Sequence, residues 1–212
     1  MKDKIDAVYR ILDSTYPDVR CALKFTNPQE LLVASILSAQ CTDERVNEVT
    51  AELFKKYRTA SDYAAAETSV LENEVHSTGF FRNKAKAIRE CAAMIETRHG
   101  GTVPDTMEEL VSLPGIGRKT ANLVLACAFD KQGIIVDTHV FRLARRIGFT
   151  DKNDSEKIEF DLRALLPEER WTRFSLLLIS HGRTICKAKK PLCPVCPVRH
   201  HCDYFANNPT AS

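Results

Sequence analysis

The chain has 212 residues, a formal net charge of +2, and 44% hydrophobic residues. This length can bury a core in one globule or in two small domains, and the apolar content excludes a disordered chain. A net charge this close to zero does not by itself indicate a nucleic-acid-binding protein. Any DNA affinity would come from local basic surfaces and backbone donors. No apolar run approaches the roughly 20 residues that span a bilayer, and the N-terminus lacks a signal-peptide core. We therefore expect a cytoplasmic protein with no membrane contact.

Helix signals begin with an apolar stripe over residues 5–12, at the spacing of one helical face. The segment 27–30, Asn-Pro-Gln-Glu, combines an N-cap, a proline at the first helical position and a capping-box glutamate. A further start lies at residues 42–43, before an inward stripe of valine and leucine. The segments 69–72 and 106–109 repeat the capping-box spacing. A helix is expected at each of these positions.

The second half of the chain continues this pattern. A helix from near Asn83 ends at Gly100-Gly101, and another runs from Arg118 to about Phe129. The apolar residues 134–136 could form a strand, but three residues without a partner cannot build a sheet. Further helices are expected over 137–147, 155–166 and 169–181, followed by a frayed polar tail at 207–212. We predict an all-α protein of about ten helices.

Half of the eight cysteines crowd into the C-terminal region, as Cys186, Cys193, Cys196 and Cys202. Such a group in an unsecreted chain is typical of a metal site and not of disulfides. Zinc sites usually show two close cysteine pairs, whereas the wider outer spacings here favour a [4Fe–4S] cluster. A zinc loop is the alternative. Basic residues around these cysteines, Lys190 among them, favour a phosphate-binding patch over an ordinary solvated surface.

Gly115 and Gly117 lie in the segment LPGIGRKTA at 113–121, between two predicted helices. Two glycines one residue apart allow a sharp turn, and the helix that starts at Arg118 presents N–H groups to a phosphate without base preference. Lys119 falls in the first turn of that helix, where the dipole disfavours a positive charge. An amine that attacks carbon must be neutral, so Lys119 is a candidate nucleophile. The alternative is a lysine that contacts phosphate only.

Asp137 follows the apolar residues 134–136 and precedes a predicted helix. An aspartate in this position is usually an N-cap, and taken alone that interpretation is favoured. However, Asp137 lies 18 residues after Lys119, so a helix, a short return and a second helix start could bring both to one cleft. A carboxylate there could activate the amine or stabilise the positive sugar that forms as a base leaves.

These features together resemble the endonuclease III family of helix-hairpin-helix DNA glycosylases. The resemblance covers nearly the whole chain and is carried by LLVASILSAQCTD at 31–43, LPGIGRKTA at 113–121, VDTHVFRLARR at 136–146 and the cysteines at 186–202. It implies a six-helix barrel domain over 21–131 that contains the hairpin. It also implies an iron–sulfur cluster domain formed by 1–20 and 132–212, with a DNA-binding cleft between the domains.

The resemblance also implies residue roles. Lys119 matches the nucleophile, Asp137 its acidic partner, and Gln40 a residue that fills the gap left by a flipped nucleotide. Phe80 departs from the aliphatic wedge that the family often has there, although an aromatic wedge is possible. Gln40 and Phe80 could otherwise be a polar helix end and a core aromatic. The full set of expected DNA contacts is Gln40, Phe80, Gly115, Gly117, Arg118, His139, Arg142 and Lys190, of which His139 and Arg142 could instead only pack.

The activity implied by the family is base-excision repair of double-stranded DNA that contains oxidised pyrimidines or abasic sites. The damaged base leaves the stack, Lys119 attacks the sugar C1′ and displaces the base, and the resulting Schiff base leads to strand cleavage by β-elimination. The cluster would serve structure and DNA binding with no required redox step. The protein would act as a monomer in the cytoplasm, associated with the nucleoid through DNA.

Two alternatives share the same motifs. An adenine-mismatch glycosylase has this scaffold, but that family usually lacks a lysine at position 119 and carries a C-terminal recognition domain that we do not expect here. A non-enzymatic helix-hairpin-helix DNA-binding module with a structural metal would keep the hairpin and the cysteines. It would not need Lys119 paired with Asp137.

Overall fold

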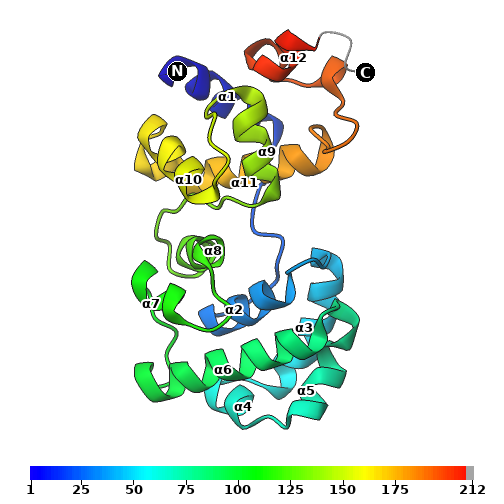
Figure 1. Cartoon of the computed structure of the whole chain (residues 1–212), viewed down its shortest axis with the longest axis vertical. Helices are drawn as coiled ribbons and strands as arrows, with labels where there is room; N and C mark the ends of the chain where they lie inside the picture. Colours follow the sequence, from blue (N-terminus) through cyan, green and yellow to red (C-terminus); the bar gives the residue numbers. More distant parts are fainter. Residues whose placement is uncertain (209–212) are drawn as a thin grey trace. The chain divides into compact units, whose positions relative to one another are not determined.

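The computed structural model describes residues 1–208, which form the α-helices α1 to α12 with short 3-10 turns and no β-strand (Figure 1). The predicted all-α class is confirmed. The chain divides into two compact units: unit 1 comprises Met1–Arg20 and Gln132–Ser212, and unit 2 comprises Cys21–Lys131. The predicted fraying of the tail falls mainly on residues 209–212, which lie outside the described residues. Within residues 1–208, no helix is long and apolar enough to cross a membrane.

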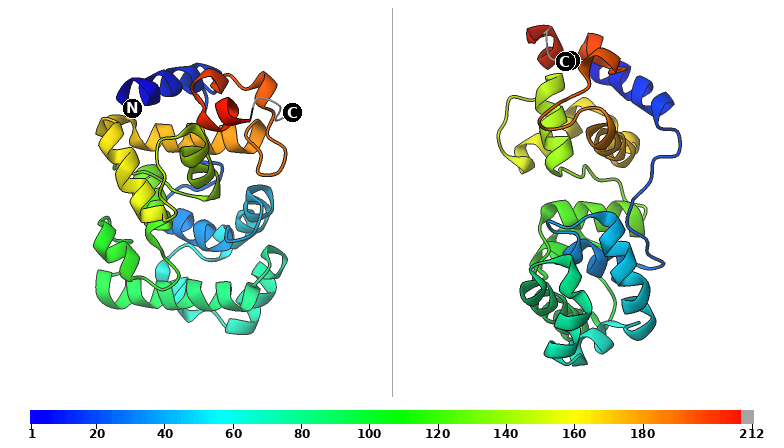
Figure 2. Two further views of the ribbon diagram at one scale, coloured as in Figure 1. Left: turned by 45° about the horizontal axis from the view of Figure 1, so that its top comes forward. Right: turned by 90° about the vertical axis from the view of Figure 1, so that its right-hand side faces the viewer.

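Unit 2 is built around α6, which packs against α4 and α5 and appears as the long green helix in Figure 2. Its helices are α2 (Pro28–Leu37), α3 (Asp43–Lys56), α4 (Ala60–Ala65), α5 (Thr68–Val75), α6 (Phe81–His99), α7 (Met107–Ser112) and α8 (Arg118–Ala128), with a 3-10 turn η1 at His76–Thr78. All residues of α2 from Leu31 to Leu37 are buried, and Ser35 is the one polar residue among them. This helix therefore lies in the interior of the unit.

Side-chain caps explain where several of these helices begin. Asn27 accepts a hydrogen bond from the Glu30 amide at 2.9 Å, and Thr42 and Thr106 cap α3 and α7 in the same way, as predicted. The predicted cap at Ser69 is wrong. The helix α5 already starts at Thr68, and the Ser69 hydroxyl donates to the Glu67 carboxylate instead of capping a backbone amide.

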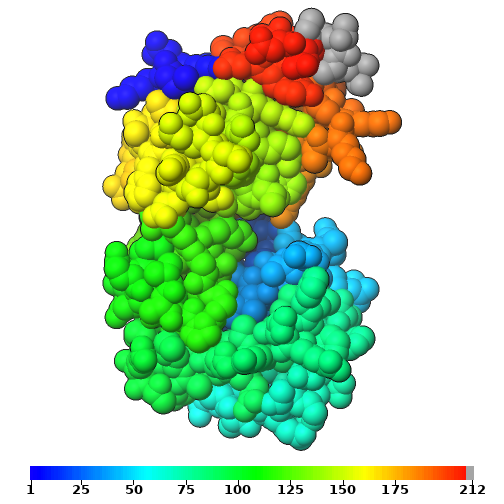
Figure 3. All heavy atoms as spheres, viewed as in Figure 1, coloured from blue at the N-terminus to red at the C-terminus, as the bar shows by residue number. Residues whose placement is uncertain are grey.

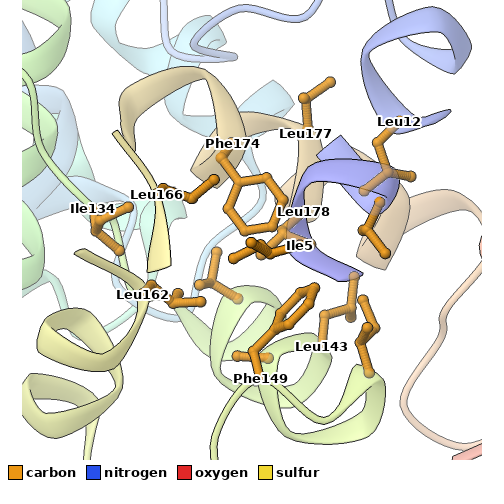
Figure 4. Packing of buried hydrophobic residues seen from close by; sticks show 14 of the residues in the cluster. Ile5, Leu12, Ile134, Leu143, Phe149, Leu162, Leu166, Phe174, Leu177 and Leu178 are labelled. Carbon is orange, nitrogen blue, oxygen red and sulfur yellow. The ribbon is translucent and has the colours of Figure 1, made fainter. Parts of the chain in front are cut away.

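Unit 1 joins the first helix of the chain to its last third. Its helices are α1 (Lys2–Thr15), α9 (Thr138–Ile147), α10 (Ser155–Leu165), α11 (Trp171–Thr184) and α12 (Asp203–Asn207). Figure 4 shows its hydrophobic core, where Ile5 and Leu12 of α1 meet Phe174 of α11 and Phe149. Because these side chains come from both ends of the chain, residues 1–20 fold as part of this unit.

The apolar residues 134–136 form a buried loop and not a strand. The Ile135 amide donates to the Ser175 hydroxyl at 3.0 Å, and the Gly133 amide donates to the Thr172 hydroxyl at 3.2 Å. Side chains of α11 thus take the place of a neighbouring strand in satisfying these amides. This loop leads directly to Asp137 and fixes its position on unit 1.

Candidate functional site

The glycine hairpin that precedes Lys119 joins α7 to α8 in unit 2. Gly115 has φ +80°, and a Cβ atom added there would lie 3.0 Å from the Ala87 Cβ of α6. Both the left-handed backbone and the close contact therefore require glycine. Gly117 is the N-cap of α8 and provides no side-chain hydrogen bond. The first turn of α8 thus lacks the capping side chain that would otherwise occupy its amides.

Lys119 is the second residue of α8 and is half-buried. The Cys21 thiol is close enough to Lys119 to interact with the charge of its ammonium group. A hydrogen bond with Cys127 lowers the pKa of Cys21 to about 7, and the Lys119 charge acts in the same direction. The amine of Lys119 therefore belongs to a partly enclosed region of unit 2 and not to a fully solvated surface.

Asp137 is the N-cap of α9 in unit 1. Its Oδ1 atom accepts hydrogen bonds from the backbone amides of His139 and Val140, both at 2.8 Å. The N-cap interpretation is thus confirmed. The cap uses one carboxylate oxygen, so it orients the group without occupying Oδ2, and the catalytic role of Asp137 stays a prediction.

Gln40 and Phe80 share an unusual backbone conformation, with φ values of 54° and 49°. Residues other than glycine seldom occupy this left-handed region, and such strain often accompanies function. Gln40 is exposed and follows the C-terminal end of α2. The Phe80 residue is 62% exposed, so the alternative that it is a core aromatic is wrong. Both side chains are available to a partner.

Lys84 is a candidate residue that the sequence analysis missed. It lies on α6 with 5% exposure, and its Nζ donates to the carbonyl oxygens of Leu37 and Thr78, both at 2.8 Å. Burial lowers the pKa of Lys84. The inward face of α6 consists of Lys84, Ala85, Ile88, Cys91, Ala92 and Ile95. Lysine is rarely buried, so its helical spacing to the apolar residues of this face could have identified Lys84 from the sequence.

The His139 and Arg142 side chains pack within unit 1. The Arg142 guanidinium donates to the Gly182 carbonyl at 3.1 Å and twice to the Cys186 carbonyl, at 3.2 and 2.8 Å. A Cβ atom on Gly182 would lie 2.7 Å from the His139 Nδ1, so glycine permits the close approach of α9 and α11. Burial lowers the pKa of His139. Contact of these two residues with DNA stays a prediction.

The four clustered cysteines line one cavity in unit 1, together with apolar residues that include Ile185, Leu192 and Phe205. Within residues 1–208, no three His, Cys, Asp or Glu side chains converge on a point where a single metal ion could sit. The four cysteines thus lie around one enclosed space. Burial raises the pKa of Cys196 to about 11.

Two basic side chains form hydrogen bonds with these sulfur atoms. The Arg146 Nη1 lies 3.4 Å from the Cys186 Sγ, and the Nε2 of the buried His181 lies 3.3 Å from the Cys196 Sγ. Burial lowers the pKa of His181 to about 4. Figure 3 shows the orange segment around residues 187–190 projecting from unit 1, and Lys190 within it is exposed.

Comparison with known proteins gives consistent results. The model of the HhH-GPD superfamily of base excision DNA repair proteins matches residues 33–168. Endonuclease III of Synechocystis sp. is 49% identical over 95% of this chain and 92% of its own length. Endonuclease III of Bacillus subtilis is 45% identical over 88% of this chain and 86% of its own.

The solved structures point in the same direction. A trapped covalent intermediate of endonuclease III with DNA has a TM-score of 0.94 and 42% sequence identity, covering 98% of each chain. A thermostable thymine-DNA glycosylase has a TM-score of 0.87, covering 97% of this chain and 98% of its own. Its identity is 23%, so it supports the fold alone.

The two hairpin glycines provide a matched pair for mutation. We expect Gly115→Ala to destabilise the protein by at least about 1–2 kcal/mol, because a side chain is strained at positive φ and would press on Ala87. The free energy of unfolding of Gly117→Ala should stay within about 1 kcal/mol of the wild-type value, since no neighbouring atom lies within 4 Å of a Cβ added at Gly117. Urea unfolding followed by circular dichroism measures both. Equal losses in the two variants would contradict this account of the turn.

Proposed function

The chain belongs to the endonuclease III family of HhH-GPD base excision DNA repair proteins, and on that premise we propose that Lys119 and Asp137 perform its chemistry. The activity is that of a DNA glycosylase and AP lyase acting on oxidised pyrimidines. One observation carries the assignment of the nucleophile: Lys119 lies in the first turn of a helix that has no side-chain cap and directly follows a glycine hairpin. An amine there stands beside backbone amides that can hold a phosphate.

DNA binding would begin at this hairpin. The amides of the first turn of α8, with Gly115, Gly117 and Arg118, would bind the backbone of the damaged strand without reading its sequence. Phe80 would enter the base stack as a wedge, and Gln40 would fill the space that the flipped nucleotide leaves. Their exposure and left-handed backbones support these roles. Lys190 would contact phosphate from the projecting loop of unit 1.

The proposed reaction has two stages. The neutral Nζ of Lys119 attacks the sugar C1′, and the bond between C1′ and the base nitrogen breaks, so the base departs with the bonding electrons and takes up a proton. The Asp137 carboxylate would accept a proton from the attacking amine and stabilise positive charge on the sugar. The nitrogen lone pair then expels the ring oxygen O4′, which takes up a proton, and the opened sugar is left joined to Lys119 through a C1′=N Schiff base. Loss of a proton from C2′ expels the 3′ phosphate and cuts the strand.

We propose double-stranded DNA with damaged pyrimidines or abasic sites as the partner, bound by a monomer. A DNA substrate would place the protein in the cytoplasm, with the nucleoid.

We further propose that Cys186, Cys193, Cys196 and Cys202 hold a [4Fe–4S] cluster. The donor set fits because four thiols line one cavity of apolar character, and Arg146 and His181 lie beside the sulfur atoms of Cys186 and Cys196. When bound, the cluster would cross-link the loop that carries Lys190, and no redox step is required of it.

Borohydride trapping tests the nucleophile. With a duplex that contains thymine glycol, the wild type should give a covalent protein–DNA band on a denaturing gel, because borohydride reduces a Schiff base. Lys119→Gln should give no band while still binding the duplex. Lys86→Gln, which changes an exposed lysine of α6, should trap like the wild type.

Each other outcome of that experiment has a definite meaning. Trapping by Lys119→Gln would show that another amine is the nucleophile. Base release by the wild type without trapping would indicate a monofunctional glycosylase. Neither release nor trapping on oxidised or abasic duplexes would favour a non-enzymatic DNA-binding module.

Asp137→Asn separates capping from chemistry. Asparagine caps helices about as well as aspartate, so stability should change by less than about 0.5 kcal/mol. Base release should fall roughly 10²–10⁴-fold in single-turnover assays, as expected when a general base is lost. The matched control is Asp154→Asn, which alters the N-cap of α10 in the same unit and should leave the rate unchanged. Equal rates in the two variants would exclude a chemical role for Asp137.

The cluster assignment predicts a metal content. Protein purified without oxygen should contain iron and acid-labile sulfide in equal amounts, close to four of each per chain, with visible charge-transfer absorption. Cys193→Ser should lose most of both, whereas Cys91→Ser, a buried cysteine of α6, should keep them. One zinc per chain and no sulfide would support the zinc loop instead.

A further inference from the structure

The burial of the charged Lys84 side chain is energetically unfavourable, and the proposed chemistry does not explain why the protein keeps it. Its ammonium is buried, and both of its acceptors are neutral carbonyl oxygens. Among the residues that the structure describes, no carboxylate forms an ion pair with it. Burying a charge in this way is expensive even when hydrogen bonds satisfy it. The position of the two carbonyls indicates what the lysine does.

Each carbonyl lies just before one of the strained, exposed side chains. Leu37 ends α2 three residues before Gln40, and Thr78 ends η1 two residues before Phe80. The Nζ of Lys84 is 2.8 Å from both oxygens, so a single ammonium joins the two loops. The backbone amide of Lys84 also donates to the Phe80 carbonyl at 3.1 Å.

The strained conformations of these loops need such an anchor. Left-handed residues other than glycine persist where their surroundings over-determine them. Local backbone bonds hold each loop separately, from Cys41 to Ser38 at 3.1 Å and from Gly79 to His76 at 3.2 Å. The contacts made by Lys84 differ from these local bonds, because one ammonium binds a carbonyl of each loop and so connects the two loops.

We propose that Lys84 is a positioning residue that holds Gln40 and Phe80 at a fixed mutual spacing for joint insertion into the duplex. This inference rests on the proposed function, since it assumes that both side chains enter DNA. A wedge and a gap-filling group must reach neighbouring positions of the base stack together, so a change in their spacing impairs opening of the stack. The chemistry at Lys119 is not affected once a sugar is already accessible.

Comparison of two substrates tests this. Lys84→Met keeps the apolar stem and removes the donors. On single-stranded DNA with an abasic site, where no stack needs opening, borohydride trapping by this variant should stay within about twofold of wild type. On a thymine glycol duplex, single-turnover excision should fall at least about 10-fold, the loss expected for one charged hydrogen bond. The control Lys86→Met, two residues away and exposed, should match the wild type on both substrates.

The outcomes distinguish the inference from the proposed function. A wild type that traps on neither substrate would refute the proposed function. Equal losses by Lys84→Met on both substrates would show a general structural role and overturn the positioning role, as would no loss on the duplex. The fluorescence of 2-aminopurine opposite a stable abasic analogue gives a direct readout of stack opening, and its increase should disappear in Lys84→Met.

A double-mutant cycle keeps the proposal testable if Lys84→Met fails to fold. Gln40→Ala and Phe80→Ala, made in the presence of Lys84, should have non-additive effects on duplex excision, since the lysine makes the two side chains act as one unit. Additive effects would mean that the two loops act independently, and the proposed role of Lys84 would be wrong.

Discussion

The first turn of an α-helix leaves backbone amides without intrahelical partners. The candidate residues of the two units satisfy this constraint in different ways. In α9, the Asp137 carboxylate occupies the amides and is thereby held in one orientation. In α8, no side chain caps the helix, and the glycine hairpin before it leaves room for another backbone to approach. A phosphate can satisfy the amides of α8. Lys119 lies in this same first turn, directly beside those amides.

At the C-terminal ends of helices, the groups without intrahelical partners are carbonyl oxygens instead of amides. These carbonyls attract cations, and the protein uses long basic side chains to bind them. Lys84 holds the last carbonyl of α2, and Arg142 binds Gly182 in the last turn of α11 and Cys186 just beyond it. Each of these side chains fixes a loop that carries candidate functional residues: the first supports the loop of Gln40, and the second supports the start of the cysteine loop. Strained or irregular backbone can then be kept next to regular helices.

Local signals in the sequence were enough to predict the fold class and several helix starts, and the resemblance of four motifs in one order predicted the family. Asn27 and Thr106 cap helices through bonds within three residues, so their patterns are readable from the chain. The pattern at Ser69 failed because its hydroxyl bonds a side chain instead, and the six-residue helix α4 was not predicted. Lys84 escaped prediction because one of its acceptors, the Leu37 carbonyl, lies 47 residues away. Such long-range contacts between a side chain and the main chain give only a weak signal in the sequence, which here is a charged residue within an apolar stripe.

The claim most central to this account is that the Lys119 amine forms the covalent bond to DNA. Mass spectrometry of the borohydride-trapped complex, after nuclease and protease digestion, locates that bond directly. We predict a reduced deoxyribose adduct on the peptide that contains Lys119, with no comparable adduct on other lysines. An adduct on a different lysine or on the N-terminal amine would contradict the assignment, and with it the role given to the first turn of α8.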